Sequence, residues 1–194
     1  MNSIAEPRRS GNLALPVTAS TDYVVRLARD AGEIRAAQRL RFQVFNLELG
    51  EGLDSSYPTG LDQDPFDEAC DHLLVLHAGS GDLAGTYRLQ TGTAALAGLG
   101  YYSEREFEFG VFEPLRTETI ELGRACVHAE HRNLAVLGLL WKGIATYARQ
   151  RGARYLMGCS SLPTMDPAIG WAVYERLSRT HSAPPERRTH PRPG

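Results

Sequence analysis

The 194-residue sequence has few cysteines and no cysteine motif. Cys70, Cys126 and Cys159 lie far apart without CxxC spacing, so the sequence indicates neither a disulfide framework nor a zinc site. It also has no apolar run near the roughly 20 residues that a membrane-spanning helix needs, and no apolar signal-peptide core at its start. We therefore expect a cytoplasmic protein in a reducing environment, and we leave peripheral contact with the inner membrane open.

Lysine is almost absent, since 20 of the 21 basic residues are arginine and only Lys142 is lysine. The formal net charge of −2 gives no reason to expect a nucleic-acid partner. With 42% hydrophobic and 23% charged residues, the chain suits one globular domain with a sizeable core. We expect that domain over residues 22–181, with a disordered N-terminal segment at 1–21 and a disordered Pro- and Arg-rich tail at 182–194.

Hydrophobic patterning predicts the order strand, helix, strand pair, strand, helix, strand, helix. A long polar loop at 50–66 follows the first helix, and a loop of this length inside a domain is more often functional or mobile than inert. A short helix is also predicted, with Ser103 as its N-cap and Glu106 as its capping-box partner. The predicted strands are 23–27, 72–77, 83–90, 120–127 and 155–160, and the predicted long helices are 30–49, 133–151 and 166–179.

The predicted strand at 120–127 carries Glu121 and Arg124 in an otherwise apolar or small-residue run. Buried charges are costly unless they are paired, so one interpretation is a structural ion pair between the two. Residues three apart in a strand point to opposite faces, so the pair could meet only if Gly123 introduces a bulge, and we predict that bulge. The functional interpretation is a glutamate that accepts a proton beside a backbone N–H that stabilises an oxyanion.

The helix after this strand is predicted to begin at the N-cap Asn133 and to end before Gly152. Its free N-terminal N–H groups suit a phosphate-bearing donor, although every helix has such an end. The last helix is expected to turn Ile169, Val173 and Leu177 inward. The stripe predicted to face the core from the first of these helices comprises Leu134, Leu137, Leu140, Trp141, Ile144 and Ala148.

An acidic stretch ends the long loop and leads into the next strand. A metal site is disfavoured because the spacing lacks the glycine and the distal glutamate of a calcium loop, and we expect none. A solvated loop face is commoner, and recognition of a cationic amine is the third interpretation, with Asp71 as the best candidate. Arg88 lies in the predicted strand 83–90, and it is either a rim residue or an anchor for a carboxylate. The acidic residues are Asp62, Asp64, Asp67, Glu68 and Asp71.

Several motifs resemble, in order and spacing, a known family. RLRFQVFNLELG, FDEACDHLLVL, GTYRLQ, GYYSEREFEF, IELGRACVHAEHRN, LWKGIATYAR, YLMGCSSLPTMDP and HSAPPE are similar to the bacterial ornithine acyl-carrier-protein N-acyltransferases, which are haemolysin-like members of the GNAT superfamily. The resemblance covers about Tyr23 to Glu186. More distantly the chain resembles the acyl-homoserine-lactone synthases, whose pattern maps onto Arg41, Phe45, Asp67, Asp71, Arg88, Glu121 and Arg124.

The resemblance implies an α/β fold: a mixed, mostly antiparallel sheet with helices on both faces, splayed at the fourth strand. It implies transfer of a 3-hydroxyacyl group from acyl carrier protein to the α-amine of ornithine, giving the lyso form of an ornithine lipid. In that reaction Glu121 would be the base, Arg124 would hold it or the substrate, and Arg88 would bind the carboxylate of ornithine. Arg41, Asp67 and Asp71 complete the expected substrate site, with Asp71 on the side-chain ammonium.

The turn before the second long helix reads HRNLAV and lacks the glycines with which coenzyme-A-using relatives cradle pyrophosphate. That favours a carrier-protein donor, whose acidic surface could meet Arg132, Arg151 and Arg154. We expect no bound cofactor, because the phosphopantetheine of the donor, or CoA, is a substrate. The expected donor site is Arg132, Asn133 and Tyr174, and Tyr174 or Tyr147 could protonate the departing thiolate.

Other interpretations stay open. One is a coenzyme-A-dependent N-acyltransferase for another small amine, such as glycine or a polyamine. Another is a non-catalytic module that binds acyl carrier protein, because relatives continue past the APPE motif and closing strands or part of the acceptor pocket are expected to be absent. A nucleophilic Cys70 beside His72 is disfavoured, since adjacent strand residues point to opposite faces.

Overall fold

The computed structural model describes residues 18–20, 22–162 and 164–193. Within these residues one sheet holds six strands in sequence order. Neighbouring strands are antiparallel except for the last pair, which is parallel. The strands are β1 (Thr18–Ala19), β2 (Tyr23–Leu27), β3 (Asp71–His77), β4 (Leu83–Thr91), β5 (Thr119–Val127) and β6 (Tyr155–Met157).

The α-helices are α1 (Ala31–Phe42), α2 (Gly92–Ala97), α3 (Leu134–Gln150) and α4 (Pro167–Thr180). In the part of the chain that the structure describes, no helix is long and apolar enough to cross a membrane. A π-helical stretch, Gln43–Glu48, continues α1, and 3-10 turns span Asp54–Ser56, Pro65–Glu68, Tyr102–Arg105, Gly110–Glu118, Ala129–His131 and Pro185–Arg187.

Side-chain caps fix the starts of the two long helices that cover the sheet. The Asp30 carboxylate accepts a hydrogen bond from the Glu33 N–H at 2.9 Å, and the Asn133 side chain accepts one from the Val136 N–H at 3.0 Å. Each bond satisfies a backbone donor that the first helical turn leaves free. After α3, Gly152 adopts a φ of 68°, a left-handed conformation that ends the helix at little steric cost. Both predicted N-caps are confirmed.

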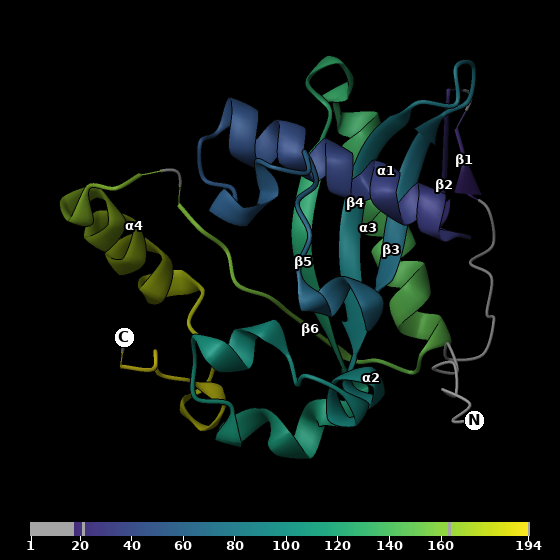
Figure 1. Ribbon diagram of the computed structural model, residues 1–194. Coiled ribbons are helices and arrows are strands. Elements are labelled where there is room, and N and C mark those ends of the chain that lie inside the picture. The colour runs from purple at the N-terminus through teal and green to yellow at the C-terminus, as the bar shows by residue number, and fades with distance from the viewer. Residues whose placement is uncertain (1–17, 21, 163, 194) are drawn as a thin grey trace, which may run out of the picture.

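The two long helices cover opposite faces of the sheet (Figure 1). On one face α3 packs on β2, β3 and β4 and forms the main core, and Gly143 lets it approach closely. A Cβ at Gly143 would lie 2.9 Å from a Leu73 methyl group and 3.0 Å from Val25. On the other face Leu40 and Val44 pack with Cys126 of β5. The predicted architecture, a mostly antiparallel sheet between helices, is confirmed.

Strand β5 is the fourth of the long strands, and its pairing with both neighbours, β4 and β6, is irregular. It pairs with β6 only as far as Glu121 and Met157, and beyond that point the two strands separate. Along β4, Arg88 pairs with Gly123 but Thr86 pairs with Cys126, so Tyr87 alone faces Arg124 and Ala125. This is a β-bulge. The predicted splay and bulge are confirmed, but the bulge is centred on Arg124, whose φ is 51°, and not on Gly123.

The stripe by which α3 faces the core differs from the prediction. Leu134 and Leu137 are exposed and Trp141 is half exposed, because the helix is rotated so that Trp141 lies over the gap between β5 and β6. The predicted Ser103 N-cap is also wrong, since its hydroxyl donates to Glu121. The α3 residues that are buried are Val136, Leu139, Leu140, Gly143, Ile144, Tyr147 and Ala148.

The C-terminal elements also differ from the prediction. Helix α4 lies apart from the sheet (Figure 1), and the inward placement of its apolar residues is wrong, because Ile169 and Leu177 are exposed. The sequence predicts a disordered tail at 182–194. In the structure the Glu108 N–H donates to the His190 carbonyl at 2.8 Å, and the Arg192 N–H donates to the Glu106 carbonyl at 2.8 Å. The tail thus lies along residues 106–108.

Candidate functional site

A cleft of about 680 Å³ opens where β5 separates from β6. Over the residues that the structure describes, the parallel pairing ends at Glu121 and Met157, so the two strands are not paired beyond these residues. Residues from both strands, from the end of β4, from the 3-10 turn at Tyr102–Arg105 and from α3 surround it. Side chains that line the cleft include Phe45, Cys70, Tyr87, Arg88, Gln90, Tyr102, Glu106, Glu121, Leu122, Arg124, Trp141, Leu156 and Cys159.

The cleft has a polar half and an apolar half. Gln90 pairs with Glu121 in the β4–β5 register, so both side chains lie on the same face of the sheet, which is the face of α1. Leu122 lies on the α3 face, where it packs against the main core. On that face the ring centroids of Tyr87 and Trp141 are 6.4 Å apart. One opening through the sheet therefore connects a charged surface with an apolar one.

Glu121 is buried, at 6% exposure, and held by the turn that begins at Tyr102. One carboxylate oxygen accepts hydrogen bonds from the Ser103 N–H at 2.7 Å and the Ser103 hydroxyl at 2.5 Å. The other accepts one from the Tyr102 N–H at 2.8 Å. Cys159, on the opposite wall, donates its thiol to the Ser103 hydroxyl at 3.4 Å. Glu121 thus lines the cleft in a fixed orientation and ties residues 102–103 to β5.

Arg124 does not pair with Glu121, so an ion pair between the two, which the sequence allowed, is wrong. The bulge directs Arg124 towards the acidic loop, where its guanidinium lies 3.5 Å from Asp62 and 3.6 Å from Asp64. It also lies over the ring of Phe45, 5.9 Å from the centroid. These contacts are long and the side chain is 22% exposed, so the guanidinium remains accessible from the cleft.

Behind the cleft, the acidic residues of the loop form a buried cluster with arginines. Arg41 is fully buried and binds Asp62 at 2.9 Å and Asp67 at 2.7 and 3.0 Å. Arg88 binds Asp64 at 2.6 Å and Asp67 at 3.0 Å. Burial by itself raises the pKa of Asp67, but hydrogen bonds from Arg41 and the charges of Arg41 and Arg88 outweigh it and hold that pKa well below its usual value.

The cluster decides where the predicted substrate residues lie. Arg88 lines the cleft, whereas Arg41 and Asp67 lie behind it and hold the loop to α1 and β4. Because all three nitrogens of Arg41 already donate to Asp62 or Asp67, the group is a structural anchor in this arrangement. Within the described residues, no group of three or more histidine, cysteine, aspartate or glutamate side chains is arranged to hold a metal ion.

Asp71 lies on the opposite face of the sheet from Arg88. Its carboxylate accepts a hydrogen bond from the Tyr147 hydroxyl at 2.7 Å and pairs with Arg151 at 3.2 Å, both from α3. Burial and the neighbouring charge of Asp71 raise the pKa of Tyr147. The structure therefore does not bring Asp71 and Tyr147 to the polar half of the cleft, because alternation along β3 turns Asp71 the other way.

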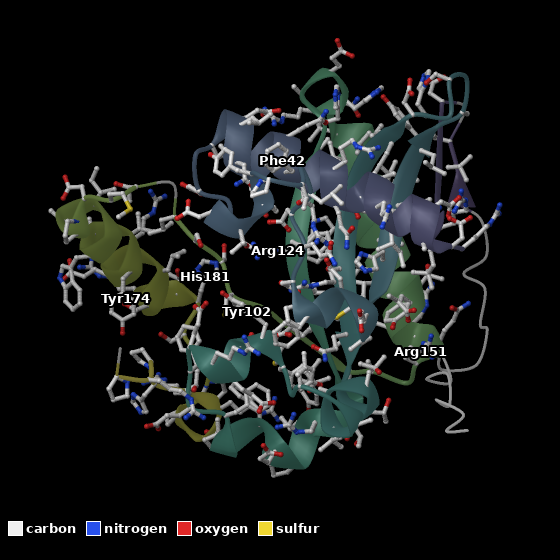
Figure 2. All side chains as sticks on the ribbon, viewed as in Figure 1. Phe42, Tyr102, Arg124, Arg151, Tyr174 and His181 are labelled. Carbon is white, nitrogen blue, oxygen red and sulfur yellow. The ribbon has the colours of Figure 1, made fainter. Side chains whose placement is uncertain are left out.

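The predicted donor residues are not gathered in one place. Arg132 pairs with Glu48, and Asn133 caps α3 and donates to the Tyr23 hydroxyl at 3.3 Å. Tyr174 lies on α4, apart from Arg124, and Arg151 lies near the far end of α3 (Figure 2). Arg132 precedes this 17-residue helix and Arg151 follows it, so about 25 Å of helix separates them. They cannot form one small patch with Arg154, which pairs with Glu118.

Sequence reasoning missed several residues of the cleft. The sequence pattern predicts a core position for Trp141 and a helix cap for Glu106, and it indicates no role for Tyr87 or Tyr102. A signal was present for Tyr102, because GYYSEREFEF carries five polar or charged side chains with no regular period. Burial raises the pKa of Cys70 to about 12 and also raises that of Cys159, so neither thiol is poised as a thiolate nucleophile.

Comparison with known proteins agrees with this arrangement. Residues 40–142 match the acetyltransferase (GNAT) domain family. L-ornithine N(alpha)-acyltransferase of Rhodobacter capsulatus is 34% identical over 86% of this chain and 66% of its own length. The enzymes of the same name from Brucella abortus and Agrobacterium fabrum are 37% and 39% identical over 74% and 73% of this chain. The chain spans 54% and 51% of those two relatives.

Solved structures share the fold at low sequence identity. The AHL synthase LasI superposes with a TM-score of 0.51 at 15% identity, over 79% of this chain and 77% of LasI. The CoA-dependent acyl-homoserine lactone synthase BjaI gives a TM-score of 0.50 at 19% identity, over 74% of this chain and 66% of BjaI. The motif resemblance to ornithine acyltransferases and the distant likeness to these synthases are thus confirmed, and the chain belongs to the GNAT acetyltransferase domain family.

Proposed function

We propose that the chain is an N-acyltransferase that moves a (3-hydroxy)acyl group from acyl carrier protein to the α-amine of L-ornithine, the first step of ornithine lipid synthesis. The observation that carries the proposal is the cleft through the sheet, charged on the α1 face and apolar on the α3 face. An amphiphilic product needs both surfaces. The relatives that share 34–39% of their aligned residues are named L-ornithine N(alpha)-acyltransferase, which supports the acceptor and the acyl transfer.

The reaction is aminolysis of a thioester. The neutral α-amine attacks the thioester carbonyl carbon, a C–N bond forms, and the C–S bond breaks to release the phosphopantetheine thiolate. The amine loses one proton to a base, and the thiolate gains one to become the free thiol. In our proposal Glu121 is the base, acting directly or through one water, and Arg124 binds the acceptor's carboxylate.

Glu121 retains the capacity for this role although it is held tightly. A carboxylate offers about four acceptor positions, and three are taken by the Tyr102 N–H, the Ser103 N–H and the Ser103 hydroxyl. One acceptor position therefore remains, and Glu121 lines the cleft. The bulge supplies the other requirement, because Arg124 and Ala125 share one residue, Tyr87, as their partner on β4. In our proposal an N–H of the bulge stabilises the tetrahedral oxyanion.

The donor is assigned to acyl carrier protein because the turn at 131–136 lacks glycines that would let the backbone fold around a pyrophosphate. Arg132 donates to the Val127 carbonyl at the end of β5, and with the N-terminal end of α3, capped by Asn133, it suits a single phosphate. The neighbour BjaI is a CoA-dependent enzyme, so acyl-CoA is the donor to test against the carrier-bound thioester.

Peripheral contact with the inner membrane is part of the same proposal. It is supported by α4, where Trp171 and Tyr174 are exposed and stacked at 5.4 Å, with Arg176 and Arg179 on the same helix. Flotation with anionic vesicles tests it. Binding that is lost in Trp171→Ala supports the contact, and a protein that stays with the bulk solution at all vesicle concentrations contradicts it.

The main test is a mass-spectrometric assay of the purified protein with 3-hydroxyacyl carrier protein and a mixture of amino acids. Acyl-ornithine is the expected product, and Glu121→Gln is expected to lower its rate by about 10² or more. Glu175→Gln, an exposed change on α4, is the matched control. Thermal unfolding of each variant separates lost chemistry from lost folding, since Glu121 also holds residues 102–103.

Product from acyl-CoA alone supports a CoA-dependent enzyme, and carrier binding without product supports a non-catalytic module.

A further inference from the structure

Four charged side chains line the cleft: Arg88, Arg124, Glu106 and Glu121. Three of them are held by other groups of the protein. Arg88 and Arg124 contact the acidic loop, and Glu121 accepts three hydrogen bonds from residues 102–103. Glu106 is exposed and takes part in none of the ion pairs among residues 22–162 and 164–193. It is therefore the exposed carboxylate of the cleft, and a cationic ligand can reach it.

The surroundings of Glu106 fix where that carboxylate lies. Its N–H donates to the Ser103 carbonyl at 3.2 Å, and its own carbonyl accepts a hydrogen bond from the Arg192 N–H at 2.8 Å. A hydrogen bond from the Tyr102 phenol to the Glu106 carboxylate, together with burial, raises the pKa of that phenol. The Tyr102 N–H in turn donates to the Glu121 carboxylate at 2.8 Å. One short turn thus ends at Glu106 and also holds Glu121 through its N–H groups.

We propose that Glu106 binds the side-chain ammonium of the acceptor and so selects a dibasic amino acid. The inference rests on the proposed acyl transfer to an amino acid and assigns the part of the site that recognises its side chain. In this arrangement the acceptor's carboxylate lies at Arg124 and its reacting amine lies at Glu121. Glu106 is then the remaining carboxylate of the cleft, and it pairs with the side-chain ammonium of the acceptor. Glu106 takes the role that the sequence predicted for Asp71.

The charge pattern explains why a neutral side chain would be a poorer acceptor. An acceptor without a terminal ammonium would shield Glu106 from water and place no opposite charge beside it. Leaving a charged group of the site unpaired in this way weakens the binding of such an analogue. Arg88 is the poorer site for the acceptor's carboxylate, because it is less exposed and its Nη1 already binds Asp64 and Asp67 at 2.6 and 3.0 Å, whereas the contacts of Arg124 are 3.5 and 3.6 Å long.

The test compares ornithine with norvaline, which has the same carbon skeleton but no terminal amine. Wild-type protein and Glu106→Gln are assayed with 3-hydroxyacyl carrier protein, and kcat and KM are measured for both acceptors. We expect Glu106→Gln to raise the KM for ornithine by about tenfold to a hundredfold, with little change for norvaline. Glu108→Gln, an exposed glutamate that does not line the cleft, is the matched control and should behave as wild type.

A merely structural role for Glu106 would slow both acceptors equally, and that result would overturn the inference. If Glu106→Gln unfolds, Glu106→Asp keeps the charge on a side chain one methylene shorter, and it should shift the preference from ornithine towards lysine, which is one methylene longer. An unchanged preference in Glu106→Asp also overturns the inference. A wild-type protein that acylates no amino acid contradicts the proposed function itself, so the two failures are distinguishable.

Discussion

Asp67 lies between two guanidinium groups that have almost no contact with water. Arg41 donates two hydrogen bonds to it and Arg88 donates one, at 2.7 to 3.0 Å. Arg41 is fully buried and Arg88 is 5% exposed, so a substitution that removes the carboxylate leaves uncompensated positive charge inside the protein. Removing one partner of a buried ion pair strongly lowers the free energy of unfolding, even where an apolar replacement of the whole pair would leave it unchanged.

We therefore expect Asp67→Asn to lower the free energy of unfolding at pH 7 by about 3 to 5 kcal/mol. The folded-state pKa of Asp67 lies below its unfolded value, so this stabilisation is complete above about pH 4 and is lost as pH falls further. The difference between wild type and variant should shrink between pH 4 and pH 2. Urea unfolding at several pH values measures it, with the exposed Glu68→Gln as control. A difference that does not depend on pH would contradict the assignment.

The charged residues show what single-sequence reasoning can reach at this scale. Glu121 and Arg124 stood out correctly, because charges in an apolar strand are uncommon and the sequence itself displays them. Their partners could not be read from the same pattern. The structure gives Glu121 the N–H groups of Tyr102 and Ser103, and gives Arg124 the carboxylates of Asp62 and Asp64. Those partners come from loops whose path is set by tertiary packing.

Among the elements, β5 determines the shape of the site. Its bulge at Arg124 and its early separation from β6 open the sheet, and α3 then places Trp141 beside the opening. Strand alternation sorts the walls, since Glu121 turns to the α1 face and Leu122 to the α3 face. The apolar wall made by Tyr87, Leu122, Trp141 and Leu156 is where the acyl chain of the donor is expected to lie.

Trp141 is the largest side chain of that wall, so we expect it to limit the length of the acyl chain. Trp141→Ala should shift the products towards longer chains while the KM for ornithine stays close to wild type, because the acceptor binds on the other face. Competition among 3-hydroxyacyl carrier proteins of graded length, with products weighed by mass spectrometry, measures the shift. Trp171→Ala is the control, since Trp171 is the other tryptophan and lies on α4. A product distribution identical to wild type would argue against this location for the chain.

The long elements could be predicted because local chemistry fixes them. The strand Tyr23–Leu27 and the N-caps Asp30 and Asn133 follow from β-branched alternation and from side chains that accept backbone N–H groups. Helix α2 and the 3-10 segment Gly110–Glu118 were not predicted, since their sequences carry no clear period. The core-facing side of α3 was also wrong, because a large apolar residue at a cleft carries the same sequence signal as one in a core.

At the scale of the whole molecule, the end of the chain returns to the site. Phe107 pairs with Pro191 in a β-bridge, and the hydrogen bonds from Glu108 to His190 and from Arg192 to Glu106 flank it. The ring of Tyr155, at the start of β6, lies 5.3 Å from the Arg187 guanidinium. Composition alone predicted disorder for such a Pro- and Arg-rich tail, because its partners lie far away in sequence. The tail supports the turn that carries Glu106.

Deleting residues 184–194 is therefore expected to loosen residues 104–109 without unfolding the sheet, since none of the described residues 184–193 belongs to the main core. The Glu108 amide loses its acceptor, so its hydrogen exchange should quicken by about tenfold or more, whereas amides in β3 and β4 should exchange as before. Exchange followed by mass spectrometry measures both regions in one experiment. Deleting only residues 193–194 is the control, because it spares the His190 carbonyl and the Arg192 N–H. Deleting residues 184–194 would also leave the Glu106 carboxylate less fixed, so the KM for ornithine should rise in this variant and not in the control. Unchanged exchange at residues 104–109 would show that the turn holds its shape without the tail, and an unchanged KM would show that the tail has no part in positioning Glu106.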